Sequence, residues 1–350
     1  MQPVTTSSSR LIPTQQRFRA LGRRLARAVE AKLTRTTITG RENIPLHGPV
    51  IFAANHASTY DAVLFIAHLP EATELVGPGD FKLLFPAEHV IKLAGIVRIK
   101  RAALDRDSLR LMSGALEAGL NLALFPEGGT WEKRLEDVKP GVAYLSHTHH
   151  VPVVPISFGG TYQVWRKIML LQNPEIHIHF GEPLPPVEIV DRKQRAQALH
   201  DYSLMLMRRI YEHLPTEDQA RYDNAARARY HAELVANVSG TRYDQRGDFS
   251  ALAEFVSKPN LISPLWRNAR LPLKPLARHD HFYPAAEFVI AAERLRSALT
   301  GEFAGYLNYR LGDEKAAQAL DELDALQQSA LDAHRSGHKL KFVVSESFVD

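Results

Sequence analysis

The hydrophobic positions of the chain follow two alternating patterns. Short, largely apolar runs of strand length occur at Val50–Ala54, Asn121–Phe125 and Val151–Phe158. Elsewhere, as between Leu104 and Gly119, apolar side chains recur every three or four positions, which is the spacing of an amphipathic helix. Strands that alternate with helices are typical of a mainly parallel sheet. The pattern therefore predicts an α/β fold, a mainly parallel mixed sheet flanked by helices.

The two ends of the chain differ from this central part. Residues 1–40 form a basic segment in which a helix is expected from Arg17 to Leu33. Residues 216–350 are expected to be a mostly helical accessory region. Its helices are predicted at Glu217–Asn237, Ala285–Ala298 and Asp313–Arg335, and residues 238–284, rich in Gly, Pro and Ser, are predicted to be irregular.

The N-terminal helix is amphipathic and basic. Its apolar stripe consists of Phe18, Leu21, Leu25, Val29 and Leu33. Arg23 and Arg27 lie on the opposite side. Such a helix fits a membrane interface, with its apolar face in the lipid and its cations among anionic head groups. The alternative is a helix that packs on its own domain and leaves an arginine face in water.

Composition narrows the class of protein. The 350 residues are 45% hydrophobic, which fills an ordinary core, and the net charge of +4 favours an anionic partner or surface. Since cysteine is absent, disulfides and a thiol nucleophile are excluded. No apolar run approaches the roughly 18 residues of a spanning helix, and no nucleic-acid-binding motif occurs. We expect a cytoplasmic protein, peripheral on the inner face of the membrane, with no nucleic-acid partner.

Candidate chemistry comes directly after the first apolar run. His56 lies in a polar turn, and Ser58 and Thr59 are helix-start residues that place Asp61 in the first helical turn. That turn can bring Asp61 back to His56, because the histidine precedes the helix. A carboxylate on one imidazole nitrogen leaves the other nitrogen able to take a proton. The pair has the parts of a general base and its orienting partner.

The same spacing recurs at His213 and Asp218, where the sequence indicates a helix end and a surface turn. Two later segments distinguish the first pair from the second. Gly95–Arg101 alternates as a strand and ends in cations, and Pro126–Thr130 is a glycine-containing turn after a strand. His56, Arg101 and Glu127 all come after predicted strands, and in parallel sheets the ligand crevice lies at the carboxyl ends of the strands.

These segments, with the apolar run at Val151–Ile156, resemble in their order the four sequence blocks of the lysophospholipid acyltransferase family. The resemblance covers residues 40–185 and identifies residues 41–215 as an acyltransferase domain. It implies transfer of a fatty acyl group from acyl-CoA or acyl-carrier protein to a hydroxyl of a glycerolipid, lysophosphatidic acid or another lysophospholipid, in phospholipid biosynthesis. No cofactor is implied beyond that acyl donor, and no metal.

The resemblance also implies residue roles. His56 with Asp61 would be the catalytic pair, Arg101 would bind an acceptor phosphate, and Glu127 with Gly128 would contact the glycerol part. From the turn geometry alone, the amide of Gly128 or Gly129 could approach an oxyanion closely, whereas a tight turn needing positive φ explains the same glycines.

One departure and two alternatives accompany this interpretation. The family's third block usually continues with an arginine after threonine, whereas Trp131 comes after Thr130 here, so Lys133 or Arg134 would have to replace that cation. The first alternative is a non-catalytic, membrane-associated lipid-binding protein on the same scaffold. The second is a metal-dependent hydrolase that uses the chain's other histidines, His177 and His179 among them.

Overall fold

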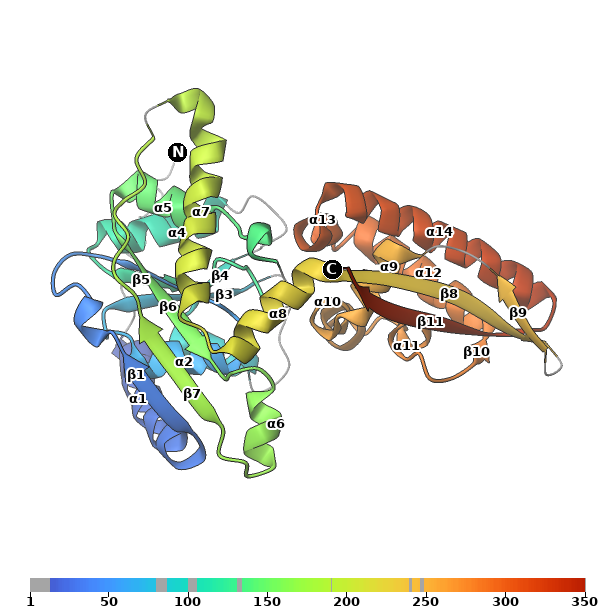
Figure 1. Cartoon of the computed structure of the whole chain (residues 1–350), viewed down its shortest axis with the longest axis horizontal. Helices are drawn as coiled ribbons and strands as arrows, with labels where there is room; N and C mark the ends of the chain where they lie inside the picture. The colour runs from blue at the N-terminus through green and yellow to red at the C-terminus, as the bar shows by residue number, and fades with distance from the viewer. Residues whose placement is uncertain are drawn as a thin grey trace. The chain divides into compact units, whose positions relative to one another are not determined.

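The computed structural model describes residues 13–79, 87–99, 106–130, 134–189, 191–238, 241–245 and 249–349. Two compact units are present (Figure 1). Within the described ranges, the first unit extends from residue 13 to Ala226 and the second begins at Arg227. Arg101, Lys133 and the predicted Leu104 helix start lie outside the described residues.

A seven-stranded sheet forms the centre of the first unit, in the order β1-β7-β6-β2-β5-β3-β4. Its strands are β1 (Arg35–Thr39), β2 (Ile51–Ala54), β3 (Thr73–Pro78), β4 (Val97–Ile99), β5 (Asn121–Leu124), β6 (Val153–Gly159) and β7 (Glu175–Phe180). All neighbouring strands pair in parallel except β6 and β7, which pair antiparallel. The predicted mainly parallel mixed sheet is confirmed.

Helices cover both faces of this sheet. They are α1 (Pro13–Leu33), α2 (Tyr60–His68), α3 (Ala87–Ala94), α4 (Arg106–Glu117), α5 (Gly141–His149), α6 (Val164–Met169), α7 (Arg195–Glu212) and α8 (Thr216–Arg227). Short 3-10 turns are η1 (Arg41–Asn43), η2 (Leu135–Asp137) and η3 (Arg192–Gln194).

Strand β2 contributes to a core on each face because consecutive side chains point to opposite sides of a strand. Phe52 and Ala54 pack with apolar residues of α2, β6 and β7. Ile51 and Ala53 pack with apolar residues of α4, α5 and α7. All four residues are fully buried. A strand buried on both faces explains the unbroken apolar run in the sequence.

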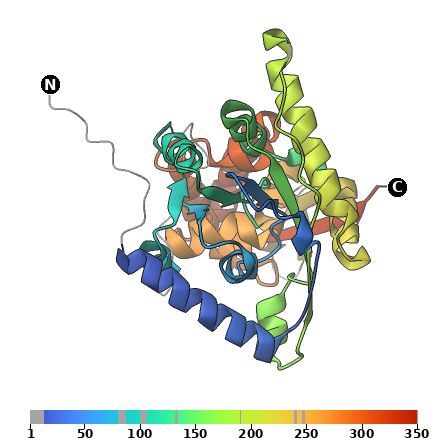
Figure 2. The same ribbon diagram turned by 90° about the vertical axis from the view of Figure 1, so that its left-hand side faces the viewer.

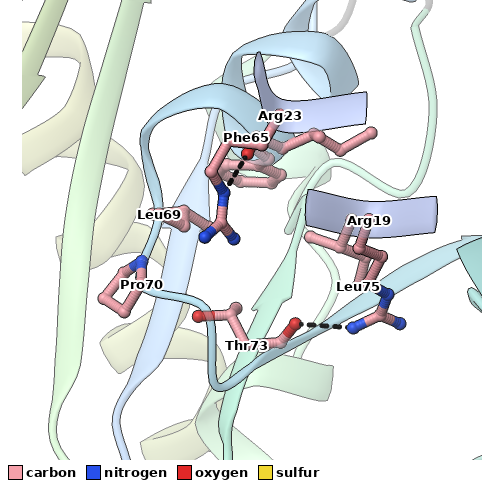
Figure 3. Close-up of a pocket in the computed structure, with 8 residues that line it drawn as sticks. Arg19, Arg23, Phe65, Leu69, Pro70, Thr73 and Leu75 are labelled. Carbon is pink, nitrogen blue, oxygen red and sulfur yellow. Dashed lines mark hydrogen bonds between the residues drawn. The ribbon is translucent and has the colours of Figure 1, made fainter. Parts of the chain in front are cut away.

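Helix α1 attaches to the unit through its arginines. Arg19 donates to the carbonyls of Thr73, Ala94 and Gly95 and pairs with Glu74 at 2.9 Å. Arg23 and Arg27 donate to two carbonyls in the last turn of α2, those of Ile66 and Ala67, where the helix dipole favours cations. Figure 3 shows Arg19 and Arg23 entering the pocket between α1 and the segment after α2.

The outward side of α1 instead carries apolar residues. Leu21 is 65% exposed and Leu25 is 63% exposed, whereas the side chains of Arg19 and Arg23 are only 10% and 15% exposed. Of the two arginines expected to face water, Arg23 is therefore mostly covered, whereas Arg27 is exposed. Guanidinium groups carry enough donors to satisfy several carbonyls at once, so here they anchor the helix and leave its leucines outside.

The second unit combines helices with an antiparallel sheet in the order β10-β11-β8-β9. The strands are β8 (Ala228–Val238), β9 (Thr241–Gln245), β10 (Tyr283–Pro284) and β11 (Lys339–Phe348). The helices are α9 (Ser250–Ser257), α10 (Pro259–Ser263), α11 (Lys274–Ala277), α12 (Ala285–Thr300), α13 (Tyr306–Leu311) and α14 (Asp313–Arg335), with a π-helical turn η4 (Pro264–Asn268).

The helical character of this region is confirmed, and two local expectations are wrong. The helix expected over Glu217–Asn237 ends at Arg227, where β8 begins. Residues 238–284 are not irregular throughout, since α9, α10 and α11 lie there. The division into an N-terminal segment (1–40), a domain (41–215) and an accessory region (216–350) remains a prediction. In the structure, α1 and most of α8 belong to the first compact unit. In the described ranges, no helix combines the length and apolar character needed to span a bilayer.

Asn55 closes the sheet at the carboxyl end of β2, and it yields a stability prediction. Its side-chain amide donates to the Phe158 carbonyl at 2.9 Å, and its oxygen accepts from the Phe158 amide at 2.7 Å. Asn55→Ala leaves both buried groups unpaired, so the free energy of unfolding should fall by about 2–5 kcal/mol. Urea denaturation of the full chain measures this loss.

Asn43→Ala is the matched control. Asn43 makes one such bond, to the Phe180 carbonyl, at a partly exposed position, so we expect a cost of about 1 kcal/mol. Equal costs for the two variants would contradict the structural role given to Asn55.

Candidate active site

The site is built where two neighbouring parallel strands end. β2 and β5 pair in parallel with Phe52 opposite Ala123, so the turns after them lie at the same edge of the sheet. His56 comes from the turn after β2, and Glu127 comes from the turn after β5. The amide of His56 donates to Glu127 Oε1 at 2.7 Å. The two predicted site residues are thus in direct contact.

Asp61 returns to His56 across the first turn of α2, as the spacing predicts. His56 Nδ1 lies 2.9 Å from Asp61 Oδ2. The same oxygen accepts from the amides of Ala57 and Ser58, both at 2.8 Å. Asp61 is fully buried, and three donors on one oxygen compensate for the loss of water around its charge. The carboxylate fixes both the turn and the imidazole.

The imidazole is held on its other side by an aromatic ring. His56 stacks on Phe125, with ring centroids 3.8 Å apart and planes 7° apart. The histidine side chain is 15% exposed. Across the described part of the chain, no hydrogen-bond partner faces its Nε2. With Nδ1 bound to the carboxylate, Nε2 is the nitrogen able to take a proton from a substrate.

Glu127 also binds a residue that the sequence analysis missed. The hydroxyl of Tyr222, on α8, donates to Glu127 Oε1 at 2.9 Å. Burial raises the pKa of Tyr222 well above its ordinary value, and the Glu127 carboxylate raises it further. The phenol therefore remains a donor. Tyr222 lies outside the four sequence blocks, and no local pattern distinguishes it from the other tyrosines of the chain.

The glycine turn is already engaged in its own hydrogen bonding. Gly128 has φ 71°, a left-handed conformation that favours glycine. Its amide donates to the Phe125 carbonyl at 2.9 Å. The turn-forming explanation therefore accounts for the conformation of Gly128, and the part of Gly128 or Gly129 as an oxyanion donor stays a prediction. Gly129 is buried beside it.

The cations expected at the site are only partly described. Arg101 and Lys133 lie outside the described residues. Arg134, the second candidate to replace the family's arginine, pairs with Asp137 at 3.0 Å. Its charge is thus already compensated by a carboxylate.

The second pair with the same spacing has a different environment. His213 stacks on His179 with centroids 3.8 Å apart. Asp218 is 6% exposed and accepts from the Gly160 amide at 2.7 Å, so the expectation of a surface turn is wrong for this residue. Burial raises the pKa of Asp218. Asp218 thus ties α8 to the end of β6.

Two further contacts connect the segment between His56 and Asp61 to α6. Trp165 Nε1 donates to Thr59 Oγ1 at 2.8 Å, and the Trp165 ring meets Tyr60 edge-on at 5.2 Å. Neither contact has a signal in the sequence. Among the residues with described positions, no group of three His, Asp or Glu side chains could hold a metal ion.

Comparisons with known proteins agree with the sequence blocks. A family model described as Acyltransferase matches residues 35–159. The 1-acyl-sn-glycerol-3-phosphate acyltransferases of Limnanthes alba and Limnanthes douglasii are each 28% identical over 177 residues, 48% of this chain and 60% of the relative. That of Cocos nucifera is 26% identical over 171 residues, 47% of this chain and 54% of the relative. The chain thus spans between half and two thirds of the length of these relatives.

Among solved structures, the 1-acyl-sn-glycerophosphate (LPA) acyltransferase of Thermotoga maritima matches with a TM-score of 0.39 and 19% identity. The match covers 55% of this chain and 78% of that chain. The matched family segment runs from β1 to β6 and includes His56, Asp61 and Glu127. On the family-model match, residues 35–159 are similar to an acyltransferase domain.

Proposed function

We propose that this protein is an O-acyltransferase that moves a fatty acyl group from a thioester, acyl-CoA or acyl-carrier protein, to a hydroxyl of a glycerolipid acceptor in phospholipid biosynthesis. Lysophosphatidic acid or another lysophospholipid is the proposed acceptor, since the matched relatives are named for that lipid class. The observation that carries the proposal is the contact of His56 Nδ1 with Asp61, which leaves Nε2 available to take a substrate proton.

In the proposed reaction, His56 Nε2 takes the proton of the acceptor hydroxyl as its oxygen attacks the thioester carbonyl. The tetrahedral intermediate then collapses, the carbon–sulfur bond breaks, and the thiolate takes the proton from the imidazolium. The products are an ester and a free thiol. Because the thioester is already activated, no acyl-enzyme is required. General-base catalysis of this kind contributes about 10² to 10⁴ in rate.

Asp61 acts on His56 rather than on the substrate. Its Oδ2 holds the proton of Nδ1, which selects the tautomer with a lone pair on Nε2, and its charge stabilises the imidazolium. The amides of Ala57 and Ser58 keep that oxygen in place. The stacked ring of Phe125 limits rotation of the imidazole. The pair is thereby held in its orientation before a substrate arrives.

The proposed substrate contacts are those that the family resemblance implies. Arg101 binds the acceptor phosphate, and Glu127, with the turn at Gly128 and Gly129, contacts the glycerol part. The Glu127 carboxylate is already fixed from two directions by His56 and Tyr222, which suits a group that positions a hydroxyl. Gly129 supplies the remaining amide for the oxyanion. No metal or other cofactor takes part in the proposed reaction.

A peripheral location on the cytoplasmic face of the membrane is part of the proposal. The outward face of α1 carries the exposed Leu21 and Leu25, and Arg24 and Lys32 are also exposed. Figure 2 shows this helix along the edge of the first unit. Leucines flanked by cations fit the boundary between acyl chains and anionic head groups.

The catalytic pair is tested by acyl transfer from radiolabelled acyl-CoA to lysophosphatidic acid. His56→Ala and Asp61→Asn should each lower kcat by about 10² to 10⁴. The first removes the base. The second removes the carboxylate charge that stabilises the imidazolium formed in the reaction.

His213→Ala is the control, because it belongs to the other pair with the same spacing and should leave kcat near that of the natural chain. Turnover by His56→Ala close to that of the natural chain would remove the catalytic assignment. If the natural chain transfers no acyl group with any of a panel of thioesters and lysolipids, the non-catalytic lipid-binding alternative is favoured.

Arg101→Ala tests phosphate binding. Loss of a charge-assisted hydrogen bond, worth about 1.5–3 kcal/mol, should raise the KM of lysophosphatidic acid about 10- to 100-fold and leave the KM of the thioester unchanged. Arg134→Ala, which removes a cation paired with Asp137, should change neither constant. Equal effects of Arg101→Ala on both substrates would count against the assignment.

Tyr222→Phe tests whether α8 positions Glu127. Removing the hydroxyl should lower kcat/KM for the acceptor about tenfold, the loss of one hydrogen bond to a charged group, without changing the KM of the thioester. Tyr202→Phe is the matched control, since that hydroxyl donates to the Pro185 carbonyl at 2.9 Å. A change confined to the melting temperature, or an equal kinetic effect of both variants, would assign Tyr222 a purely structural role.

A further inference from the structure

The segment around α6 exposes an unusual concentration of apolar side chains. Fifteen large hydrophobic residues are exposed in the described ranges, and five of them lie between residues 162 and 171. They are Tyr162 at 37%, Trp165 at 43%, Met169 at 76%, Leu170 at 55% and Leu171 at 83%. A single exposed leucine needs no explanation, whereas a cluster of this kind marks an interaction surface.

The backbone of this segment is held in conformations that L-residues rarely adopt. Gln163, Leu171 and Asn173 have φ values of 52°, 53° and 45°. They are three of the five non-glycine residues with positive φ in the described part of the chain. Such conformations cost free energy and persist where the surroundings enforce them. Leu171, the most exposed leucine of the segment, is thus held in a backbone conformation that costs free energy.

The inner side of the segment is firmly attached to the first unit. Val164 and Ile168 are buried in the core that includes β6. The guanidinium of Arg221 lies 3.6 Å from the centre of the Tyr162 ring. Trp165 donates to Thr59, in the turn between His56 and Asp61. The exposed Met169, Leu170 and Leu171 therefore belong to a segment that is attached beside the turn between His56 and Asp61.

The positive charge of the segment favours an anionic partner. Arg166 and Lys167 lie among the apolar residues, and residues 160–174 contain no acidic side chain. This combination fits an anionic lipid leaflet. Leucine and methionine side chains can enter the acyl region, and a tryptophan indole can lie at its boundary. The two cations can contact the lipid phosphates. The lower part of Figures 1 and 2 contains both α6 and part of α1, whose leucines are also exposed.

We propose that residues 162–171 form a second membrane-contact surface, separate from α1, that holds the candidate active site against an anionic lipid leaflet. The acceptor lipid then reaches His56 from the leaflet rather than from water. This inference rests on the proposed function for its purpose. Its physical content, insertion of Leu171 and its neighbours into lipid, does not depend on catalysis.

The absence of cysteine from the sequence allows a direct test. Leu171→Cys, Leu25→Cys and Leu46→Cys variants of the full chain are each labelled with an environment-sensitive fluorophore. They are mixed with vesicles of phosphatidylcholine alone or of phosphatidylcholine with phosphatidylglycerol. Leu46 is 91% exposed and precedes β2, at the opposite end of that strand from His56, so it is the matched control.

We expect a blue shift of the label at position 171 with anionic vesicles and none at position 46. Position 25 reports the contact of α1 independently. No shift at position 171, or an equal shift at position 46, overturns the proposal. A shift at position 171 that requires an acidic protein such as acyl-carrier protein, and not vesicles, also overturns it and assigns the surface to a protein partner.

A second measurement tests how much Leu170 and Leu171 contribute to the affinity of the protein for anionic vesicles. The double variant Leu170→Ser and Leu171→Ser should bind anionic vesicles about 100-fold more weakly in a flotation assay, as expected when two leucine side chains no longer enter lipid. Leu46→Ser should bind like the natural chain. Unchanged binding of the double variant contradicts the proposal. Because neither assay measures turnover, insertion without acyl transfer would instead refute the proposed function alone.

Discussion

The parallel pairing of β2 with β5 is the constraint on which the site depends. It places two turns at one edge of the sheet, one carrying His56 and the other carrying Phe125 and Glu127. The amide of His56 then reaches the Glu127 carboxylate, and the imidazole lies flat on the Phe125 ring. Both contacts require register between the strands, because a shift of one residue would turn each side chain to the other face. Asn55 maintains that edge by pairing with β6.

Sequence patterns predicted the centre of the sheet because β2 and β6 are buried along their whole length and end at clear polar turns. The contact of His56 with Asp61 was predictable as well, since five residues and one helix start determine it. Tyr222 was not, because its partner Glu127 is 95 positions away and a tyrosine in a polar helix has no distinguishing pattern. Strand β8 was assigned to a helix because its alanine-rich sequence favours one, and pairing with β11 overrides that propensity.

Helix α1 shows why amphipathicity alone does not give the orientation of a helix. Its apolar stripe suggested burial in either lipid or core, yet Arg19 and Arg23 face the domain. Carbonyls at the end of α2 and near β3 offer acceptors that would otherwise need water, and guanidinium groups satisfy several of them. The leucines are thereby left outside. At α6 the inner side is instead apolar, with Val164 and Ile168 buried, and Trp165 adds an exposed hydrogen bond to Thr59.

The first compact unit extends beyond the segment that the family model recognises. That segment ends at residue 159, whereas α8 supplies polar contacts to the unit that include Tyr222 on Glu127 and Asp218 on Gly160. A chain shortened before α8 would leave the buried Glu127 carboxylate without one of its donors, which costs more than the bond itself contributes. Since α8 runs directly into β8 at Ala228, the chain passes from the first unit into the second at the end of the helix that carries Tyr222.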